Sequence, residues 1–126
     1  VSAMTYRYTI KAIPPSNNKF IGRNARGEYQ KVKKEWADLI RFSCRPYPKQ
    51  PIDKSVVQIT YCFPTRVRHD PDNYSGKMIL DGLTSAGIIA DDSFSHITLM
   101  LRAKVDKKNP HTEITITEVD DLCTTE

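Results

Sequence analysis

Alternation of apolar and polar side chains predicts four β-strands in this chain. In Thr5–Ile13 apolar side chains occupy every second position, which is the pattern of a strand with one buried face. The same alternation occurs in His96–Val105, and a last strand is predicted at Thr112–Val119. The most apolar strand is Ser55–Phe63, and it is followed by Pro64, which cannot donate to a strand ladder.

Two further segments carry apolar residues at the three- and four-residue spacing of an amphipathic helix. The first is Glu28–Cys44, whose stripe includes Val32, Trp36 and Ile40. Three prolines in Arg45–Pro51 end this helix, because proline lacks the amide that a helix interior requires.

The second helix is predicted to begin near Asp72 or Asn73, which are both good N-cap residues, and to run to Ala86. Gly76 falls on its buried stripe, where a missing side chain would let the helix approach the sheet closely. Gly87 is predicted to be the first residue beyond the helix, because glycine adopts the left-handed conformation that ends many helices.

The predicted order of elements is β-α-β-α-β-β, without an internal repeat or linker. This order indicates one α+β domain over residues 4–119, with two main helices packed on a single mixed sheet. Residues 120–126 are predicted to form a short acidic tail. A chain of 126 residues can bury one hydrophobic core without disulfides.

Charge is distributed unevenly along the chain, although the net charge is only +4. Residues 1–68 carry 14 Lys and Arg against 4 Asp and Glu, whereas residues 69–126 carry 5 against 11. A basic half favours a polyanionic partner such as nucleic acid, although ordinary solvated charge would explain the balance equally well. The candidate DNA-binding residues are Lys19, Arg23, Arg26, Lys31, Lys34, Arg66 and Arg68.

Several classes of protein are not indicated by the sequence. No run of about 18 apolar residues occurs, and no secretory signal is recognised, so neither a membrane span nor export is predicted. Cys44, Cys62 and Cys123 form no CxxC pair, and the histidines show no ligand spacing, so the sequence does not predict a zinc site. A reduced, cytoplasmic setting is expected.

Carboxylates gather on both sides of the second predicted helix. Asp70 and Asp72 flank a proline before it, and Asp91 and Asp92 follow it. Aspartate oxygens suit a hard cation such as Mg²⁺ or Mn²⁺, and without a cation two close carboxylates would disfavour each other's ionisation. The structural alternative is that Asp-Pro and Asp-Asn simply form turns and that the helix dipole favours Asp at a helix start.

Lys77 is predicted to lie one helical turn beyond Asn73, on a face that also carries Asp81. A lysine beside metal-binding aspartates can stabilise the extra charge of a pentavalent phosphate. Alternatively, Lys77 is a surface lysine paired with Asp81, which would contribute a few tenths of a kcal/mol. Carboxylates, lysine and basic surface together favour metal-activated attack of water on a phosphodiester.

The stretch "DPDN…K…DGLTSAGIIADD" in residues 70–92 resembles the RusA-like Holliday junction resolvases. The resemblance implies a Mg²⁺-dependent homodimeric endodeoxyribonuclease, with Mn²⁺ able to substitute, that cuts four-way DNA junctions during recombination and repair in bacterial or phage-infected cells. The catalytic residues that it implies are Asp70, Asp72, Lys77 and Asp92. The metal ligands that it implies are Asp70, Asp72, Asp92 and, in a supporting role, Asp91.

Two features of this stretch bear on the site. Three residues, "YSG", separate Asn73 from Lys77 where the family's pattern has two, and along a continuous helix this would rotate the lysine by about 100°. Asp92 follows the far end of a predicted helix about 21 Å long. An extended Gly87–Asp92 segment could return about 20 Å towards Asp72. Otherwise Asp92 would meet the other aspartates from a second subunit.

Two other functions remain open at this stage. One is a branched-DNA-binding protein of the same fold that has lost catalysis or changed specificity. The other is an aspartate-nucleophile phosphatase, since DxD also occurs in that class. A phosphatase needs an apolar parallel strand that runs directly into the motif, whereas "PTRVR" intervenes here.

Overall fold

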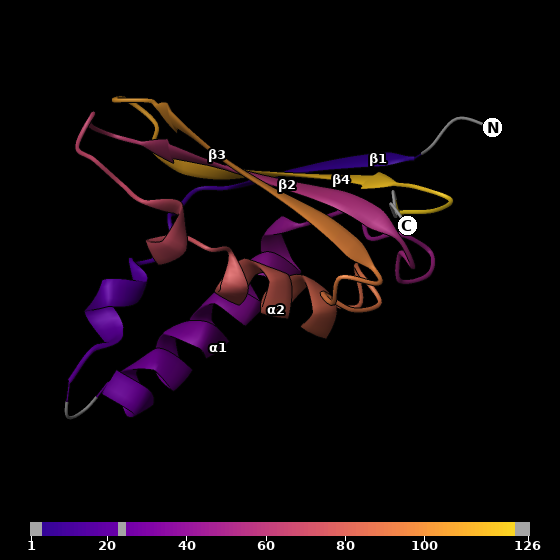
Figure 1. The fold of residues 1–126 in the computed structure, drawn as a ribbon, viewed down its shortest axis with the longest axis horizontal. Helices are drawn as coiled ribbons and strands as arrows, with labels where there is room; N and C mark the ends of the chain where they lie inside the picture. The colour runs from indigo at the N-terminus through magenta and orange to yellow at the C-terminus, as the bar shows by residue number, and fades with distance from the viewer. Residues whose placement is uncertain (1–3, 23–24, 123–126) are drawn as a thin grey trace, which may run out of the picture.

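The computed structural model describes residues 4–22 and 25–122 and shows a sheet with helices beneath it (Figure 1). One domain with a mixed sheet and two helices confirms the predicted α+β class. Short 3-10 turns are labelled η. The elements are β1 (Thr5–Ile10), η1 (Asn17–Phe20), α1 (Ala25–Ser43), β2 (Ser55–Phe63), η2 (Pro71–Asn73), α2 (Lys77–Ser85), β3 (Ile97–Val105) and β4 (His111–Glu118).

The four strands form one sheet in the order β1-β4-β2-β3. Strand β4 runs antiparallel to both of its neighbours, whereas β2 and β3 are parallel, with Ser55 opposite Ile97 and Phe63 opposite Val105. Parallel neighbours require a crossover connection, and α2 provides it. The segment before α2 and the segment after α2 therefore lie at opposite ends of the sheet.

Both helices cover the same face of the sheet (Figure 1). Val57 and Ile59 of β2 point into this layer and are fully buried, as are Ile40 of α1 and Leu83 of α2. Full burial of such a side chain contributes about 1.5–3 kcal/mol, so this layer is the main source of stability. Within residues 4–22 and 25–122, no element covers the opposite face, and the fold has two layers.

The two helices approach each other closely at a glycine. A Cβ atom added to Gly82 of α2 would lie 2.5 Å from Cδ1 of Ile40 in α1, which is too close for any real side chain. Among the described helices none is long and apolar enough to cross a membrane.

The edge strand β3 departs from the predicted burial. Alternation placed Ile97, Leu99, Leu101 and Ala103 on one buried face, but Leu99 is 36% exposed and Ala103 is exposed as well. Ile97 is buried, and Leu101 is partly buried against the core. The other edge strand, β1, keeps Tyr8 and Ile10 buried under α1, whereas neither helix packs closely on β3.

Candidate active site

The aspartates of the DPDN sequence lie on η2, a 3-10 turn in the chain that leaves β2. Asp70 caps this turn, and the amides of Asn73 and Tyr74 donate to the carbonyls of Asp70 and Pro71 at 3.0 and 3.1 Å. Pro71 begins the turn, where its missing N–H would have no partner in any case. The DPDN sequence thus forms a turn, as expected if Asp-Pro and Asp-Asn act as turn formers. This turn carries both Asp70 and Asp72.

Aromatic side chains hold both ends of this turn against the sheet. His69 stacks on Phe63 of β2, with 3.7 Å between ring centroids and 2° between planes. Tyr74 packs edge-on against both rings, 5.1 Å from Phe63 and 5.3 Å from His69. Aromatic pairs contribute about 0.5–1.5 kcal/mol beyond burial. Since the cluster grips the residues before Asp70 and after Asn73, it limits the movement of the turn between them.

The loop after β1 braces the same turn. Nδ2 of Asn17 donates to the backbone carbonyl of Asp72 at 3.1 Å and lies 3.5 Å from Oγ of Ser75. Ser16 caps η1, and its hydroxyl accepts from the amide of Asn18 at 3.2 Å. The "PPSNNK" stretch therefore positions the backbone that carries the second aspartate.

Helix α2 begins at Lys77, which corrects the predicted start near Asp72 or Asn73. The residue before it, Gly76, has a φ of +81°, in the left-handed region that side chains disfavour. A Cβ atom on Gly76 would lie 2.7 Å from Cδ1 of Ile59 in the sheet. Glycine therefore permits the close approach that the sequence suggested, but as the residue before the helix rather than within it.

The break at "YSG" changes the expected setting of the lysine. The insertion lies before the helix, so it does not rotate Lys77 around a continuous helix, and Asn73 does not share a helical face with Lys77. Asp81 does share that face, with 3.9 Å between Nζ of Lys77 and Oδ2 of Asp81. Lys33 of α1 approaches the same oxygen at 3.6 Å. The Lys77 side chain remains 65% exposed.

The end of α2 confirms the predicted stop at Gly87. Gly87 has a φ of +76°, and its amide donates to the carbonyl of Thr84 at 3.1 Å. The amide of Ile88 donates to the carbonyl of Leu83 at 3.0 Å, which completes a Schellman motif. The chain then turns away from α2.

Beyond this stop the chain is fastened to the segment before β2. Ile89 forms a parallel bridge with Ile52, and the amide of Ala90 donates to the carbonyl of Ile52 at 2.9 Å. Asp91 and Asp92 therefore lie near the start of β2, not near its end.

The two pairs of aspartates are thus at opposite ends of the sheet. Asp70 and Asp72 follow the end of β2, whose nine residues span about 26 Å at the usual rise. The extended return of Asp92 towards Asp72, one of two paths open to the sequence, does not occur within this chain. Among the described residues, no group of three potential metal ligands includes Asp70, Asp72, Asp91 or Asp92.

The second pair of aspartates has its own local contacts. The hydroxyl of Ser93 lowers the pKa of Asp91, and the backbone amide of Asp92 adds to this effect, because both stabilise the charged carboxylate. Oδ2 of Asp91 also lies 3.8 Å from Nδ1 of His96. Asp91 is therefore engaged with its neighbours, while the side chain of Asp92 is exposed.

A protein-family model described as "Endodeoxyribonuclease RusA" matches residues 10–117. The chain belongs to the RusA endodeoxyribonuclease family. The matched range contains the DPDN turn, α2 and both later aspartates. The search of curated proteins gave no match. Membership in a DNA-cleaving family favours a nuclease over the aspartate-nucleophile phosphatase.

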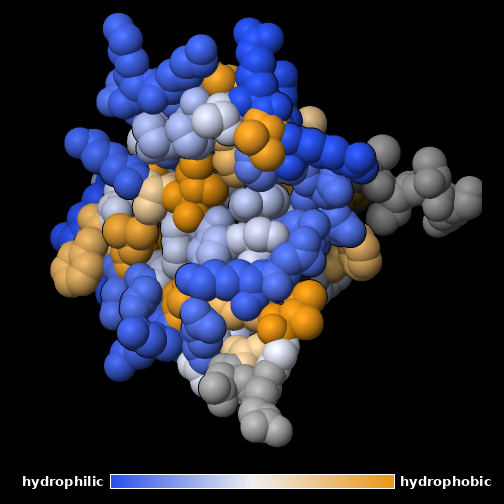
Figure 2. Space-filling view, turned by 90° about the vertical axis from the view of Figure 1, so that its left-hand side faces the viewer, coloured by the Kyte–Doolittle hydropathy of each residue, from blue (hydrophilic) through white to orange (hydrophobic). Residues whose placement is uncertain are grey.

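Several basic side chains of this RusA-family protein come from elements at the end of the sheet that carries the DPDN turn. They come from η1, from α1 and from the loop before η2, and Figure 2 shows hydrophilic side chains that project around this end. Arg26 and Lys77 line one open hollow. Arg68 Nε lies 3.0 Å from Oδ1 of Asp70, and Lys19 Nζ lies 3.6 Å from Oε1 of Glu28. The exposed members are Lys19, Arg26, Lys31, Lys34, Arg66 and Arg68.

Some predicted residues lie outside the part of the chain that the structure describes. These are Arg23 and the last four residues of the acidic tail, 123–126, which include Cys123. The start of the tail is described, and Asp121 lies 3.6 Å from the amino group of Lys54.

One group of potential ligands escaped the sequence analysis. Within residues 4–22 and 25–122, Cys62, His111 and Glu113 are the only three Cys, His, Asp or Glu side chains with ligand atoms within 4.8 Å of one another. His111 was expected in the turn before the strand predicted at Thr112–Val119, but β4 begins at His111, so His111 and Glu113 share a face of this strand. Their approach to Cys62 depends on the pairing of two distant strands, which the sequence does not reveal.

Proposed function

We propose that this protein is a Mg²⁺-dependent endonuclease that cuts four-way DNA junctions, with Mn²⁺ able to replace Mg²⁺. We further propose that it acts as a homodimer in which each site combines side chains of two subunits. The homodimer with shared sites is supported by one observation, the separation of Asp92 from Asp70 and Asp72 by the length of β2. If these carboxylates act together, a second chain has to supply one set.

Asp70 and Asp72 fit a hard cation, because oxygen ligands suit Mg²⁺ and the η2 turn holds both residues on a braced backbone. When bound, the cation supplies Lewis-acid activation of the attacking water and offsets charge on the phosphate. Arg68, which pairs with Asp70, shows that this carboxylate already attracts a positive group. The loop that carries Arg68 also provides Arg66 for contact with the DNA backbone.

Lys77 would stabilise the charge that develops on the phosphate during cleavage. Its pairing with Asp81 spans 3.9 Å, longer than the 3.6 Å between Lys33 and the same oxygen. Oδ2 of Asp81 is buried, whereas the Lys77 side chain is 65% exposed, so a phosphate in solvent can draw the lysine away from this oxygen. Lys33 can then keep Asp81 paired.

Homodimer formation would bring the exposed Asp92 of one subunit to the DPDN turn of the other. A two-fold dimer has two such sites, which suits a four-way junction with approximate two-fold symmetry. Phe94, two residues beyond Asp92, is 99% exposed. An apolar ring in that position is consistent with a contact to a second chain or to DNA bases.

The proposed function is tested by cleavage of matched junction, flap and duplex DNA with Mg²⁺, with Mn²⁺ and with EDTA. We expect cuts in the junction with either cation and none with EDTA. Equal cleavage of all three substrates would contradict junction specificity. Tight junction binding without cuts under any condition would support the alternative, a non-catalytic branched-DNA-binding protein. Light scattering in the same buffers should give the mass of a dimer, and a monomer that still cuts junctions would overturn the shared site.

A further inference from the structure

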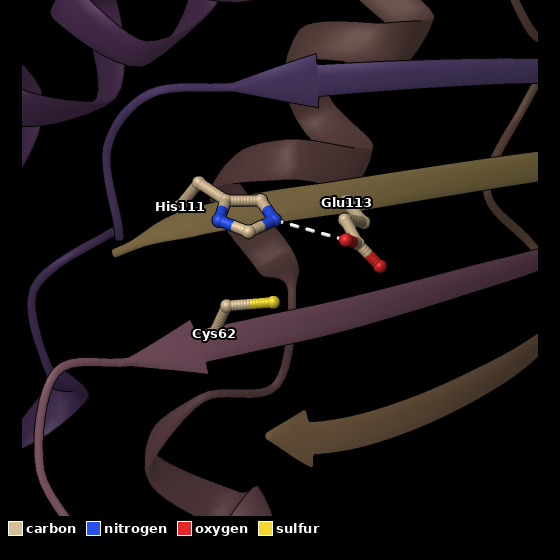
Figure 3. Close-up of side chains that lie close together, drawn as sticks. All are labelled: Cys62, His111 and Glu113. Carbon is tan, nitrogen blue, oxygen red and sulfur yellow. Dashed lines mark hydrogen bonds and ion pairs between the residues drawn. The ribbon is translucent and has the colours of Figure 1, made fainter. Parts of the chain in front are cut away.

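We propose that Cys62, His111 and Glu113 form a second metal site, which binds Zn²⁺ within a single chain. Cys62 lies near the end of β2, and His111 is its direct partner at the start of β4. Glu113 follows two residues later, so its side chain points to the same face of the sheet. This face is the one without helices, and Figure 3 shows the three side chains gathered on it.

The geometry requires only small side-chain adjustments to close around an ion. The three ligand atoms lie within 4.8 Å of one another, and Nε2 of His111 is 2.9 Å from Oε2 of Glu113. Zinc bonds to nitrogen and oxygen are about 2.0–2.2 Å long and to sulfur about 2.3 Å, so ligands of one ion lie about 3–4 Å apart. Cys62 is only 1% exposed, which keeps its sulfur on the inner side of the cluster.

The imidazole is held in the orientation that a ligand histidine needs. Nδ1 of His111 lies 2.6 Å from the backbone carbonyl of Asn109, to which its N–H donates. This contact orients the ring so that Nε2 faces Cys62 and Glu113, and a metal would replace the proton through which Nε2 donates to Glu113. Metal-bound histidines almost always donate their other ring N–H to a carbonyl or carboxylate in this way.

The chemistry of the ligands separates this site from the DPDN turn. A thiolate and an imidazole favour zinc and other transition metals, whereas aspartate oxygens alone favour Mg²⁺. Three protein ligands leave a fourth tetrahedral position for water. Burial raises the pKa of the Cys62 thiol, and binding of zinc as a thiolate complex would release a proton.

The simplest competitor for the carboxylate is Lys104 on the neighbouring strand. Its Nζ lies 3.4 Å from Oε1 of Glu113, and its side chain is more than half exposed. Lys104 can therefore neutralise Glu113 in the metal-free protein and move into solvent when an ion binds. If no metal binds, Lys104, Glu113 and His111 form an ordinary surface ion-pair cluster.

A bound ion would link β2 to β4 at the end of the sheet that precedes the DPDN turn. Cys62 is followed by Phe63, whose ring supports His69 in the aromatic cluster. The helices and the DPDN turn lie beyond the other face of the sheet, so the ion would add stability without entering the nuclease site.

The test is binding of Zn²⁺ and of Co²⁺ to the full chain in a Cys123→Ser background, which removes the thiol outside the described residues. We expect one equivalent of either metal, an intense near-ultraviolet thiolate-to-cobalt band and a higher Tm with Zn²⁺. Cys62→Ser should abolish the band and weaken Zn²⁺ binding at least about tenfold, and Glu113→Gln should weaken it too. Circular dichroism verifies that each variant is folded.

Lys104→Ala should have the opposite effect to the ligand substitutions. It removes the ammonium group that competes for Glu113, so Zn²⁺ should bind more tightly. Absence of the cobalt band, or a band that persists in folded Cys62→Ser, would overturn the proposed site. Because the two sites use different ligands, Cys62→Ser should bind and cut DNA with Mg²⁺ as the parent does. This separates failure of the zinc site from failure of the nuclease proposal.

Discussion

The protein carries two sets of potential metal ligands that arise in different ways. Cys62, His111 and Glu113 lie on two adjacent strands, and the register of one strand pair brings them together. Asp70 and Asp92 lie in loops on either side of a crossover, at opposite ends of the sheet. Strand pairing can thus gather ligands within one chain, whereas a crossover separates its two ends, and in the proposed nuclease a second chain completes the site.

The largest effect is expected at the DPDN turn. Asp72→Asn keeps the shape of the side chain but removes its charge, so we expect junction cleavage to fall at least about 100-fold while junction binding persists. Cleavage and gel-shift assays on the same DNA measure the two effects. Asp38→Asn on α1 is the matched control and should cut normally, and normal cutting by Asp72→Asn would disprove the proposed active site.

A mixing experiment tests whether the separated aspartates meet between subunits. Asp72→Asn and Asp92→Asn are each inactive in the proposal, but their heterodimer contains one site with both aspartates intact. Random mixing gives half heterodimers with one intact site of two, so nicking should return to about a quarter of the parent rate. If each site belonged to one chain, every site in the mixture would carry a substitution and no activity would return.

The role of Lys77 is tested against that of Lys33, since both pair with Asp81. Lys77→Met should lower the cleavage rate at saturating DNA about 10–100-fold, because it removes a charge that acts on the developing phosphate. Lys33→Met should change this rate less than about twofold. Equal effects of the two substitutions would assign Lys77 to the helix surface instead.

The two glycines that border α2 offer a matched pair for stability. Gly76→Ala combines a positive φ with a 2.7 Å contact to Ile59, so we expect a loss of about 2–4 kcal/mol in the free energy of unfolding. Gly87 has a similar φ but open space around it, and Gly87→Ala should cost only about 1 kcal/mol. Urea unfolding measures both, and equal losses would show that contact with the sheet does not matter.

The smallest expected effect is on the free energy of unfolding at alkaline pH, through a buried tyrosine of the core. Burial raises the pKa of Tyr8 from 10.0 to about 12, and its hydroxyl donates to the carbonyl of Pro46 at 2.8 Å. The pKa of Tyr8 is higher in the folded than in the unfolded protein. The stability that this difference contributes is fully present below the unfolded pKa of 10.0, and it is lost as the pH rises towards the folded pKa of about 12. Tyr8→Phe should cost about 1 kcal/mol at pH 8 and reduce the loss of stability between pH 10 and 12, measured by thermal unfolding.

Cys44 adds a second contribution that Tyr8→Phe leaves in place. Burial raises the pKa of its thiol from 9.0 to about 12, so the variant should still lose stability above pH 9. A variant whose alkaline unfolding is unchanged from that of the parent would contradict the assignment to Tyr8.

Local patterns in the sequence predicted most of the elements. The apolar run Ser55–Phe63 coincides with β2, and Gly87 ends α2 as expected. Both results depend on neighbours in the chain, namely Pro64 after the strand and a glycine that tolerates a positive φ. The DPDN residues, Lys77 and the later Asp91–Asp92 pair together likewise indicated the RusA family before any fold was known.

Two errors show where local patterns were not enough. The helix predicted from Asp72 or Asn73 begins only at Lys77, because packing against Ile59 favours a left-handed Gly76 over a continued helix. The exposure of Leu99 arises because neither helix packs closely on β3, which alternation along one strand does not disclose.

The sequence by itself determined which side chains are available and which face of each element they occupy, because chemistry and periodicity are local properties. The tertiary structure alone decided which of them meet. It separated Asp92 from Asp70, since a parallel pair of strands requires a crossover along the whole sheet. It also joined Cys62 to His111, since pairing between distant strands depends on how the entire core packs.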